Sequence, residues 1–140
     1  MRTLLKRDGL ALLLCALLVA PLGQTYAHPG HADPVTISRD TNVYMQKLVP
    51  HYLTIQQGLA AGELNDEVKG AAQAIERLAK KGGKKESDSS GKKMYKAVAK
   101  SAGFIAVAND VGSAREEFAE LSDTLLPFFD NWPNHILEHD

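Results

Sequence analysis

The sequence predicts an all-α protein, an antiparallel helical bundle of about four helices after a cleaved signal peptide. Of its 140 residues, 44% are hydrophobic and only 6% are aromatic, a composition that suits helices better than a β-sandwich or barrel. Apolar residues recur at spacings of three and four over four stretches, and no stretch alternates with a period of two. The length allows one domain.

Residues 1–27 have the organisation of a secretory signal peptide. Three basic residues occur among the first seven, and residues 9–22 carry no charge. This uncharged run is shorter than the roughly 20 residues that a membrane-spanning helix needs. We therefore predict cleavage after Ala27 and a periplasmic protein without stable membrane insertion. The only cysteine, Cys15, would leave with the signal. A retained membrane anchor and a lipoprotein cut at Cys15 are the alternatives.

After the signal, residues 28–39 are expected to form a flexible lead-in to a helical-bundle domain over residues 40–140. The first helix is expected over residues 40–61, because five apolar residues recur there at helical spacing. They are Tyr44, Leu48, Tyr52, Ile55 and Leu59. Pro50 should kink or break this helix, since it lacks an amide hydrogen and clashes with the preceding turn. Gly62 should end it.

Asn65 is expected to cap the second helix. The apolar face of this helix consists of Val68, Ala72, Ile75 and Leu78. The pair Gly82 and Gly83 should stop it after a basic last turn. Residues 82–91 contain only Gly, Lys, Ser, Asp and Glu, which predicts a solvated, mobile loop.

The third helix is expected over residues 92–109, and Asn109 or Asp110 should cap the fourth. The inward face of the third helix consists of Tyr95, Val98, Ala102, Ile105 and Ala106. The fourth has the most regular pattern, formed by Val111, Ala114, Phe118, Leu121, Leu125 and Phe128. Met45 and Met94 are expected in the core.

Charge is nearly balanced, with a formal net charge of −1, which argues against a nucleic-acid binder. The lysines gather around residues 82–91, and the last third of the chain is acidic. This basic cluster consists of Lys80, Lys81, Lys84, Lys85, Lys92, Lys93, Lys96 and Lys100. It is either a solvated face, the more common case, or a docking surface. In the second case we expect Lys84, Lys85, Lys92, Lys93 and Arg115 to carry the interaction.

Histidines are the candidate metal ligands. After cleavage His28 would be the N-terminal residue, whose amine and imidazole can chelate copper or zinc, with His31 as a further nitrogen ligand. Residues 135–139 (HILEH) match the letters of an inverted zinc-protease motif, and on a helix His135 and His139 share a face. The alternative is a solvated tail at each end. His51 is expected to be a half-buried histidine rather than a ligand.

The sequence does not indicate an enzyme. Loss of Cys15 with the signal would exclude a thiol nucleophile. Ser122 lies within a helical stretch, where its hydroxyl is expected to bond to the preceding turn. Gly82 and Gly83 lack the spacing and the preceding strand of a phosphate-binding loop.

Residues 52–63 (YLTIQQGLAAGE) and 114–122 (AREEFAELS) resemble a bacterial helical domain of unknown function. That domain occurs alone in the periplasm or fused to periplasmic adaptor subunits of heavy-metal efflux pumps, and the resemblance spans roughly residues 40–130. Arg115, Phe118 and Ser122 match its second segment, together with Leu121. Family members commonly continue into a Cys-Pro-Met segment, which this chain lacks.

Together these features predict a periplasmic, non-enzymatic accessory or binding module. The resemblance and the terminal histidines suggest a link to copper or zinc handling, with envelope or efflux-pump proteins as partners. The alternative is a structural protein-interaction module of an envelope complex without a metal role.

Overall fold

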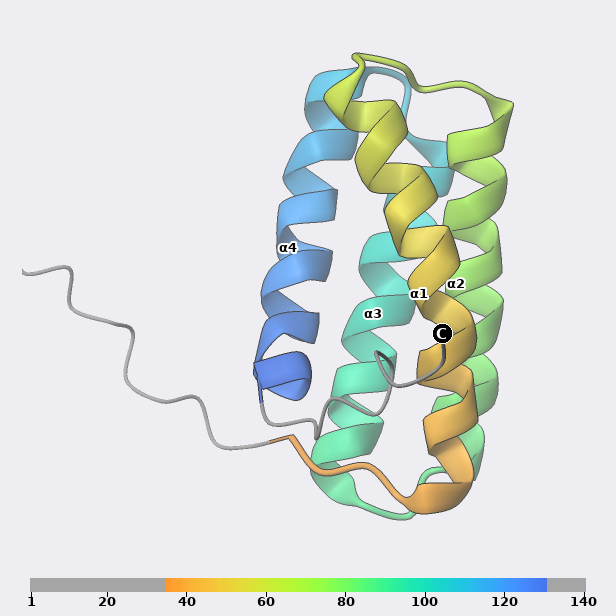
Figure 1. Cartoon of the computed structure of the whole chain (residues 1–140), viewed down its shortest axis with the longest axis vertical. Coiled ribbons are helices and arrows are strands. Elements are labelled where there is room, and N and C mark those ends of the chain that lie inside the picture. The colour runs from red at the N-terminus through yellow and green to blue at the C-terminus, as the bar shows by residue number, and fades with distance from the viewer. Residues whose placement is uncertain (1–34, 131–140) are drawn as a thin grey trace, which may run out of the picture.

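The computed structural model describes residues 35–130. Four helices run alternately up and down to form an antiparallel bundle (Figure 1). They are α1 (Arg39–Ala60), α2 (Asp66–Lys85), α3 (Ser89–Val107) and α4 (Val111–Asp130). The all-α bundle is therefore confirmed. The predictions for the signal peptide and for His28, His31, His135 and His139 lie outside the described residues.

Each helix packs mainly on its neighbours in the chain: α2 lies between α1 and α3, and α4 packs on α3. Among the helix pairs in contact, α1 and α4 contact each other over the fewest residues. None of the helices in residues 35–130 has the length and apolarity needed to cross a membrane. The bundle core is made largely of small and aliphatic side chains, with Tyr95 and Phe128 as its buried aromatic residues.

Most of the core residues expected from the sequence are buried, among them every one expected in α3. Met45 and Met94 are also in the core, as predicted. Five expected core residues are only partly buried and pack against its edge: Tyr44, Tyr52, Leu78, Val111 and Phe118. The helical spacing thus identifies the correct faces, and the outer members of each stripe lie at the bundle surface.

The contact between α1 and α4 is made by aromatic and polar side chains. The rings of Tyr52 and Phe118 lie with their centroids 4.8 Å apart, and the Tyr52 hydroxyl is 2.8 Å from the Ser122 Oγ. Ser122 also donates to the Phe118 carbonyl at 2.7 Å. The predicted bond from Ser122 to the preceding turn is therefore confirmed.

α1 continues through Pro50, so the predicted break is wrong. Pro50 cannot donate to the carbonyl of Gln46 four residues earlier. Both residues are exposed, which leaves that carbonyl close to water. Gly62 follows the end of α1 in a left-handed conformation, with φ +78, a backbone geometry that glycine adopts without strain.

The predicted loop over residues 82–91 is also wrong. α2 runs through Gly82 and Gly83 to Lys85, and α3 already begins at Ser89. The glycines have a packing role here, because a Cβ added to Gly82 would lie 2.5 Å from Cε1 of the buried Tyr95. Rather than ending the helix, this pair of glycines lets the ring of Tyr95 lie against the α2 backbone.

Capping residues fix three of the helix starts. The Asn65 side chain accepts from the Val68 amide at 3.0 Å, and Asp110 accepts from the Ser113 amide at 2.8 Å, as predicted. Asp88 accepts from the amides of Ser90 and Gly91 and so starts α3 three residues before the predicted position. α3 ends at Val107 rather than at residue 109.

Candidate docking groove

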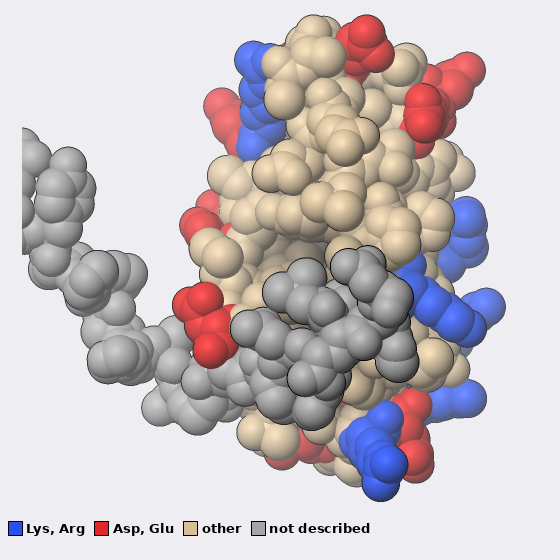
Figure 2. Space-filling view, in the orientation of Figure 1, with Lys and Arg blue, Asp and Glu red and all other residues tan. Residues whose placement is uncertain are grey.

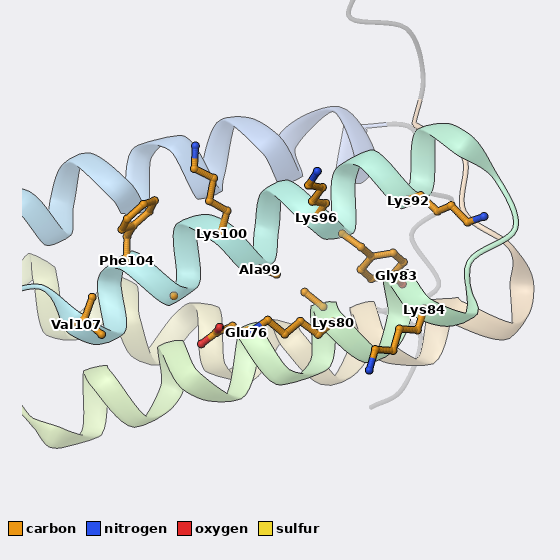
Figure 3. Close-up of a pocket in the computed structure, with 13 residues that line it drawn as sticks. Glu76, Lys80, Gly83, Lys84, Lys92, Lys96, Ala99, Lys100, Phe104 and Val107 are labelled. Atoms are coloured by element: carbon orange, nitrogen blue, oxygen red, sulfur yellow. Dashed lines mark hydrogen bonds and ion pairs between the residues drawn. The ribbon is translucent and has the colours of Figure 1, made fainter.

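A groove of about 820 Å³ runs along the outer side of α2 and α3. Figure 3 shows the lining side chains of these two neighbouring helices, with Lys96 and Lys100 extending away from α2 and Lys84 extending away from α3. The groove is lined by Glu76, Ala79, Lys80, Gly83, Lys84, Lys92, Tyr95, Lys96, Ala99, Lys100, Gly103, Phe104 and Val107. We call it the α2–α3 groove. Its volume lies within the range of natural ligand sites.

Helical periodicity places the lysines in two rows. Residues four apart in a helix share a face, so Lys80 and Lys84 lie along the α2 side of the groove. Lys92, Lys96 and Lys100 lie along the α3 side. In the view of Figure 2, positive side chains project along the edge of the molecule where α2 lies.

The floor between the rows is apolar because small residues recur at the same spacing. Ala79 and Gly83 line it from α2, and Ala99 and Gly103 line it from α3. These residues bring the two backbones close together. A Cβ added to Gly103 would lie 3.4 Å from the Glu76 carboxylate on the opposite helix. The groove therefore has small residues along its centre, the Glu76 carboxylate beside Gly103, and ammonium groups along its sides.

One end of the groove is an exposed apolar surface. Phe104 is 47% exposed and Val107 is 70% exposed, although large apolar side chains are usually buried in water-soluble folds. Lys100 Nζ lies 5.8 Å from the centroid of the Phe104 ring, within the range of a cation–π contact. This end combines apolar area with a positive charge.

Positive charge on the groove is largely uncompensated. Glu76 is the only acidic residue that lines it, and its carboxylate lies 2.5 Å from the Lys80 ammonium group. Within residues 35–130 no other ion pair is found, so Lys84, Lys92 and Lys96 each lack a carboxylate at salt-bridge distance. An anionic group bound here would reduce the repulsion among these ammonium groups.

The structure separates the five interaction residues predicted from the sequence. Lys84 and Lys92 line the groove, whereas Lys85 and Lys93 do not. Lys85 Nζ instead lies 5.7 Å from the Tyr44 ring centroid. Phe104 and Val107 were not predicted to be part of a site. Their spacing from Lys100 would have shown that they continue the same face of α3.

Arg115 does not line the groove and has a structural contact of its own. Its Nε and one terminal nitrogen donate to the carbonyl of Leu59, at 3.0 and 2.6 Å. That carbonyl belongs to the last turn of α1, where helix carbonyls lack partners within the helix. Within the described residues Arg115 thus ties α4 to the end of α1.

A buried carboxylate that was not predicted from the sequence organises the base of the bundle. Glu86 is 2% exposed. It accepts the Ser38 amide at 3.1 Å, those of Ser87 and Asp88 at 2.8 and 2.9 Å, and the hydroxyl of Thr41. Burial alone would raise the pKa of Glu86, but these hydrogen bonds outweigh it and hold the pKa below its usual value.

The phenol of Tyr95 completes this network from α3. Its hydroxyl donates to the carbonyl of Thr41 at 2.7 Å, and burial, the largest influence, raises the pKa of Tyr95 to about 12. Glu86 and Tyr95 together attach the start of α1 to the turn between α2 and α3. This network supports the wall of the groove on which Tyr95 lies.

Metal ligation is not apparent in the described part of the chain. Residues 35–130 hold no group of three or more His, Cys, Asp and Glu side chains placed to bind a metal. His51 is half-buried on α1, as predicted. The four histidines predicted as ligands lie at the chain ends outside residues 35–130, so the copper or zinc site stays a prediction.

Comparison with protein-family models, curated proteins and solved structures finds no match for this chain. The resemblance to the periplasmic helical domain therefore stays a prediction.

Proposed function

We propose that this protein is an exported, non-enzymatic binding module whose α2–α3 groove docks an anionic partner in the bacterial envelope. One observation carries the proposal: five lysines flank a single apolar groove that has one acidic residue. Export is supported by the charge and apolar pattern of residues 1–27. The resemblance to a domain found with efflux-pump adaptors favours an envelope protein as the partner.

A solvated basic face is the alternative explanation of the lysines. Lysines that only keep a helix soluble are expected on polar surfaces, whereas these surround an apolar floor. Phe104 at the end of that floor is nearly half exposed, and Val107 is more exposed still. Apolar area rimmed by polar groups is typical of interaction surfaces, which favours docking over simple solvation.

The chemistry of the lining supports binding rather than turnover. The groove has one hydroxyl, that of Tyr95, and this hydroxyl is used in the bond to the Thr41 carbonyl. Its raised pKa makes it harder to deprotonate than an ordinary tyrosine, which is already protonated at neutral pH. The remaining polar groups are ammonium groups and the Glu76 carboxylate, which is paired with Lys80.

Chemical cross-linking in the producing bacterium tests the proposal. The wild-type protein should give a defined cross-linked partner whose yield falls as ionic strength rises, because exposed charge pairs are screened by salt. The double variant Lys84→Glu, Lys92→Glu should abolish that product. Lys47→Glu, Lys81→Glu makes the same change in net charge at exposed positions that do not line the groove, and it should retain the product. Equal yields from both variants would refute the groove as the docking surface.

A further inference from the structure

The groove has a repeat that matches one kind of ligand. Both lysine rows and the small residues of the floor recur every four residues, which is close to one helical turn of 5.4 Å. The α3 side extends from Lys92 to Val107, a length of roughly 22 Å along a helix. A ligand that contacts the whole groove must therefore be elongated, with an apolar centre and negative charge along both sides.

We propose that the occupant is an amphipathic acidic helix of a partner protein, about four turns long. This inference rests on the proposed function and names the class of partner. The apolar stripe of the helix would lie on the floor at Ala79 and Ala99, with its end against Phe104. Carboxylates on its two flanks would meet Lys84 on one side and Lys96 on the other. Recognition of an amphipathic helix by an apolar groove is a recurrent mode of protein binding.

Other ligands fit these observations less well. A small anionic amphiphile has one headgroup and would neutralise only one or two lysines, leaving the others along both rows without a counter-charge. A bilayer is flat on this scale, so it would meet the rims and the protruding Val107 but not the floor between the rows. A helix has both the length of the groove and the repeat of its lysines.

A second copy of this chain is also a poor match. Its most acidic helix is α4, where Glu116, Asp123 and Asp130 are exposed. These residues are seven apart and so share one face. They occupy the centre of the face that α4 turns away from the bundle. A helix docked in the groove would need apolar residues at that position. Docking α4 would place these carboxylates on the floor at Ala99, away from the ammonium groups.

Fluorescence anisotropy with a synthetic peptide tests the inference on the full chain. The probe is a labelled 16-residue helix with leucines at helical spacing and glutamates on both flanks, and the control probe replaces each glutamate with lysine. We expect the acidic probe to bind with a Kd of about 1–50 μM and the basic probe not to bind. Lys96→Glu, Lys100→Glu should weaken binding by about tenfold or more, whereas Lys47→Glu, Lys81→Glu should change it less than about twofold.

A second pair of variants tests the apolar contact. Phe104→Ala should weaken binding of the acidic probe by about fivefold or more. Leu53→Ala removes a side chain of similar exposure, 45% against 47%, from α1 outside the groove, and it should have no effect. Circular dichroism checks that all variants remain helical.

The inference would be overturned by equal affinity for both probes, by equal loss in groove and control variants, or by sedimentation showing self-association that the groove variants abolish. Stronger binding to anionic vesicles than to the acidic probe, lost in the same variants, would also overturn it in favour of a membrane. If the probe fails but cross-linking in the bacterium still depends on Lys84 and Lys92, the helix is wrong and the proposed function stands. If both fail, the groove is not a docking site.

Discussion

Substituting Gly82 with alanine should destabilise the bundle, although alanine is the better helix former. In an exposed helix interior, glycine to alanine stabilises by about 1 kcal/mol. At Gly82, however, the new Cβ would lie 2.5 and 2.6 Å from Cε1 and Cζ of Tyr95. The ring is fully buried and its hydroxyl is bonded to the Thr41 carbonyl, so it cannot withdraw without losing that bond.

The magnitude follows from these opposing effects. Overpacking of a buried site costs about 1–3 kcal/mol, and loss or distortion of the Tyr95 hydrogen bond adds about 1 kcal/mol. After the helix-propensity gain is subtracted, we expect the free energy of unfolding to fall by about 1–3 kcal/mol. For a domain of this size that lowers Tm by about 4–8 °C per kcal/mol.

Gly70→Ala provides the matched control. Gly70 is in the same helix, and a Cβ there would meet nothing within 4 Å. We expect this variant to be more stable than the wild type by about 0.5–1 kcal/mol. Urea unfolding followed by circular dichroism measures both. If Gly82→Ala is stabilised as much as Gly70→Ala, the packing of Tyr95 on the α2 backbone is not as described and the reasoning fails.

Three further perturbations test other parts of the structure. Glu86→Gln should lower the free energy of unfolding by about 1–3 kcal/mol at pH 7. Because the pKa of Glu86 is depressed in the folded protein, its stabilising effect is present above the unfolded pKa and is lost as pH falls through the folded pKa. If the free energy of unfolding of Glu86→Gln falls as steeply in acid as that of the wild type, this role of Glu86 is wrong. Arg115→Ala should destabilise by about 1 kcal/mol, measured by urea unfolding, and Arg115→Lys should recover part of the loss; no change would mean that the bond to Leu59 contributes nothing. Native mass spectrometry of the protein from the periplasm should give a chain beginning at His28 with bound copper or zinc, and His28→Ala, His31→Ala should release the metal. A metal-free chain of that mass would reject the N-terminal site and leave the docking proposal unaffected.

Local sequence signals correctly predicted the features that depend on residues within a single helix. The apolar stripe of α4 and the caps at Asn65 and Asp110 each require only spacing within a short segment, and all three are confirmed. Gly82 was misassigned because its partner, Tyr95, lies in the next helix, and no local rule distinguishes a helix stop from a close helix contact. Glu86 was missed for the same reason: a glutamate in a polar segment is normally exposed, and its burial depends on Ser38 and Thr41 from far along the chain.

The candidate groove was predicted only in part. Its lysines were recognised as a cluster, because their density is visible in the sequence. The division into Lys84 and Lys92, which line the groove, and Lys85 and Lys93, which do not, depends on the rotation of α2 and α3 about their axes. The spacing of Phe104 from Lys100 was visible in the sequence, but the groove that Phe104 ends exists only where the two helices lie side by side.

The uneven contacts of α4 have a consequence for local stability. α4 packs on α3 but contacts α1 over few residues, among them Tyr52 and the Leu59 carbonyl that Arg115 binds. The groove, by contrast, lies wholly on α2 and α3, and α1 packs on α2 from its other side. Segments held by fewer contacts open at lower free energy than the rest of a fold. Amide protons of α4 should therefore exchange with solvent before those of α2, which packs on both α1 and α3.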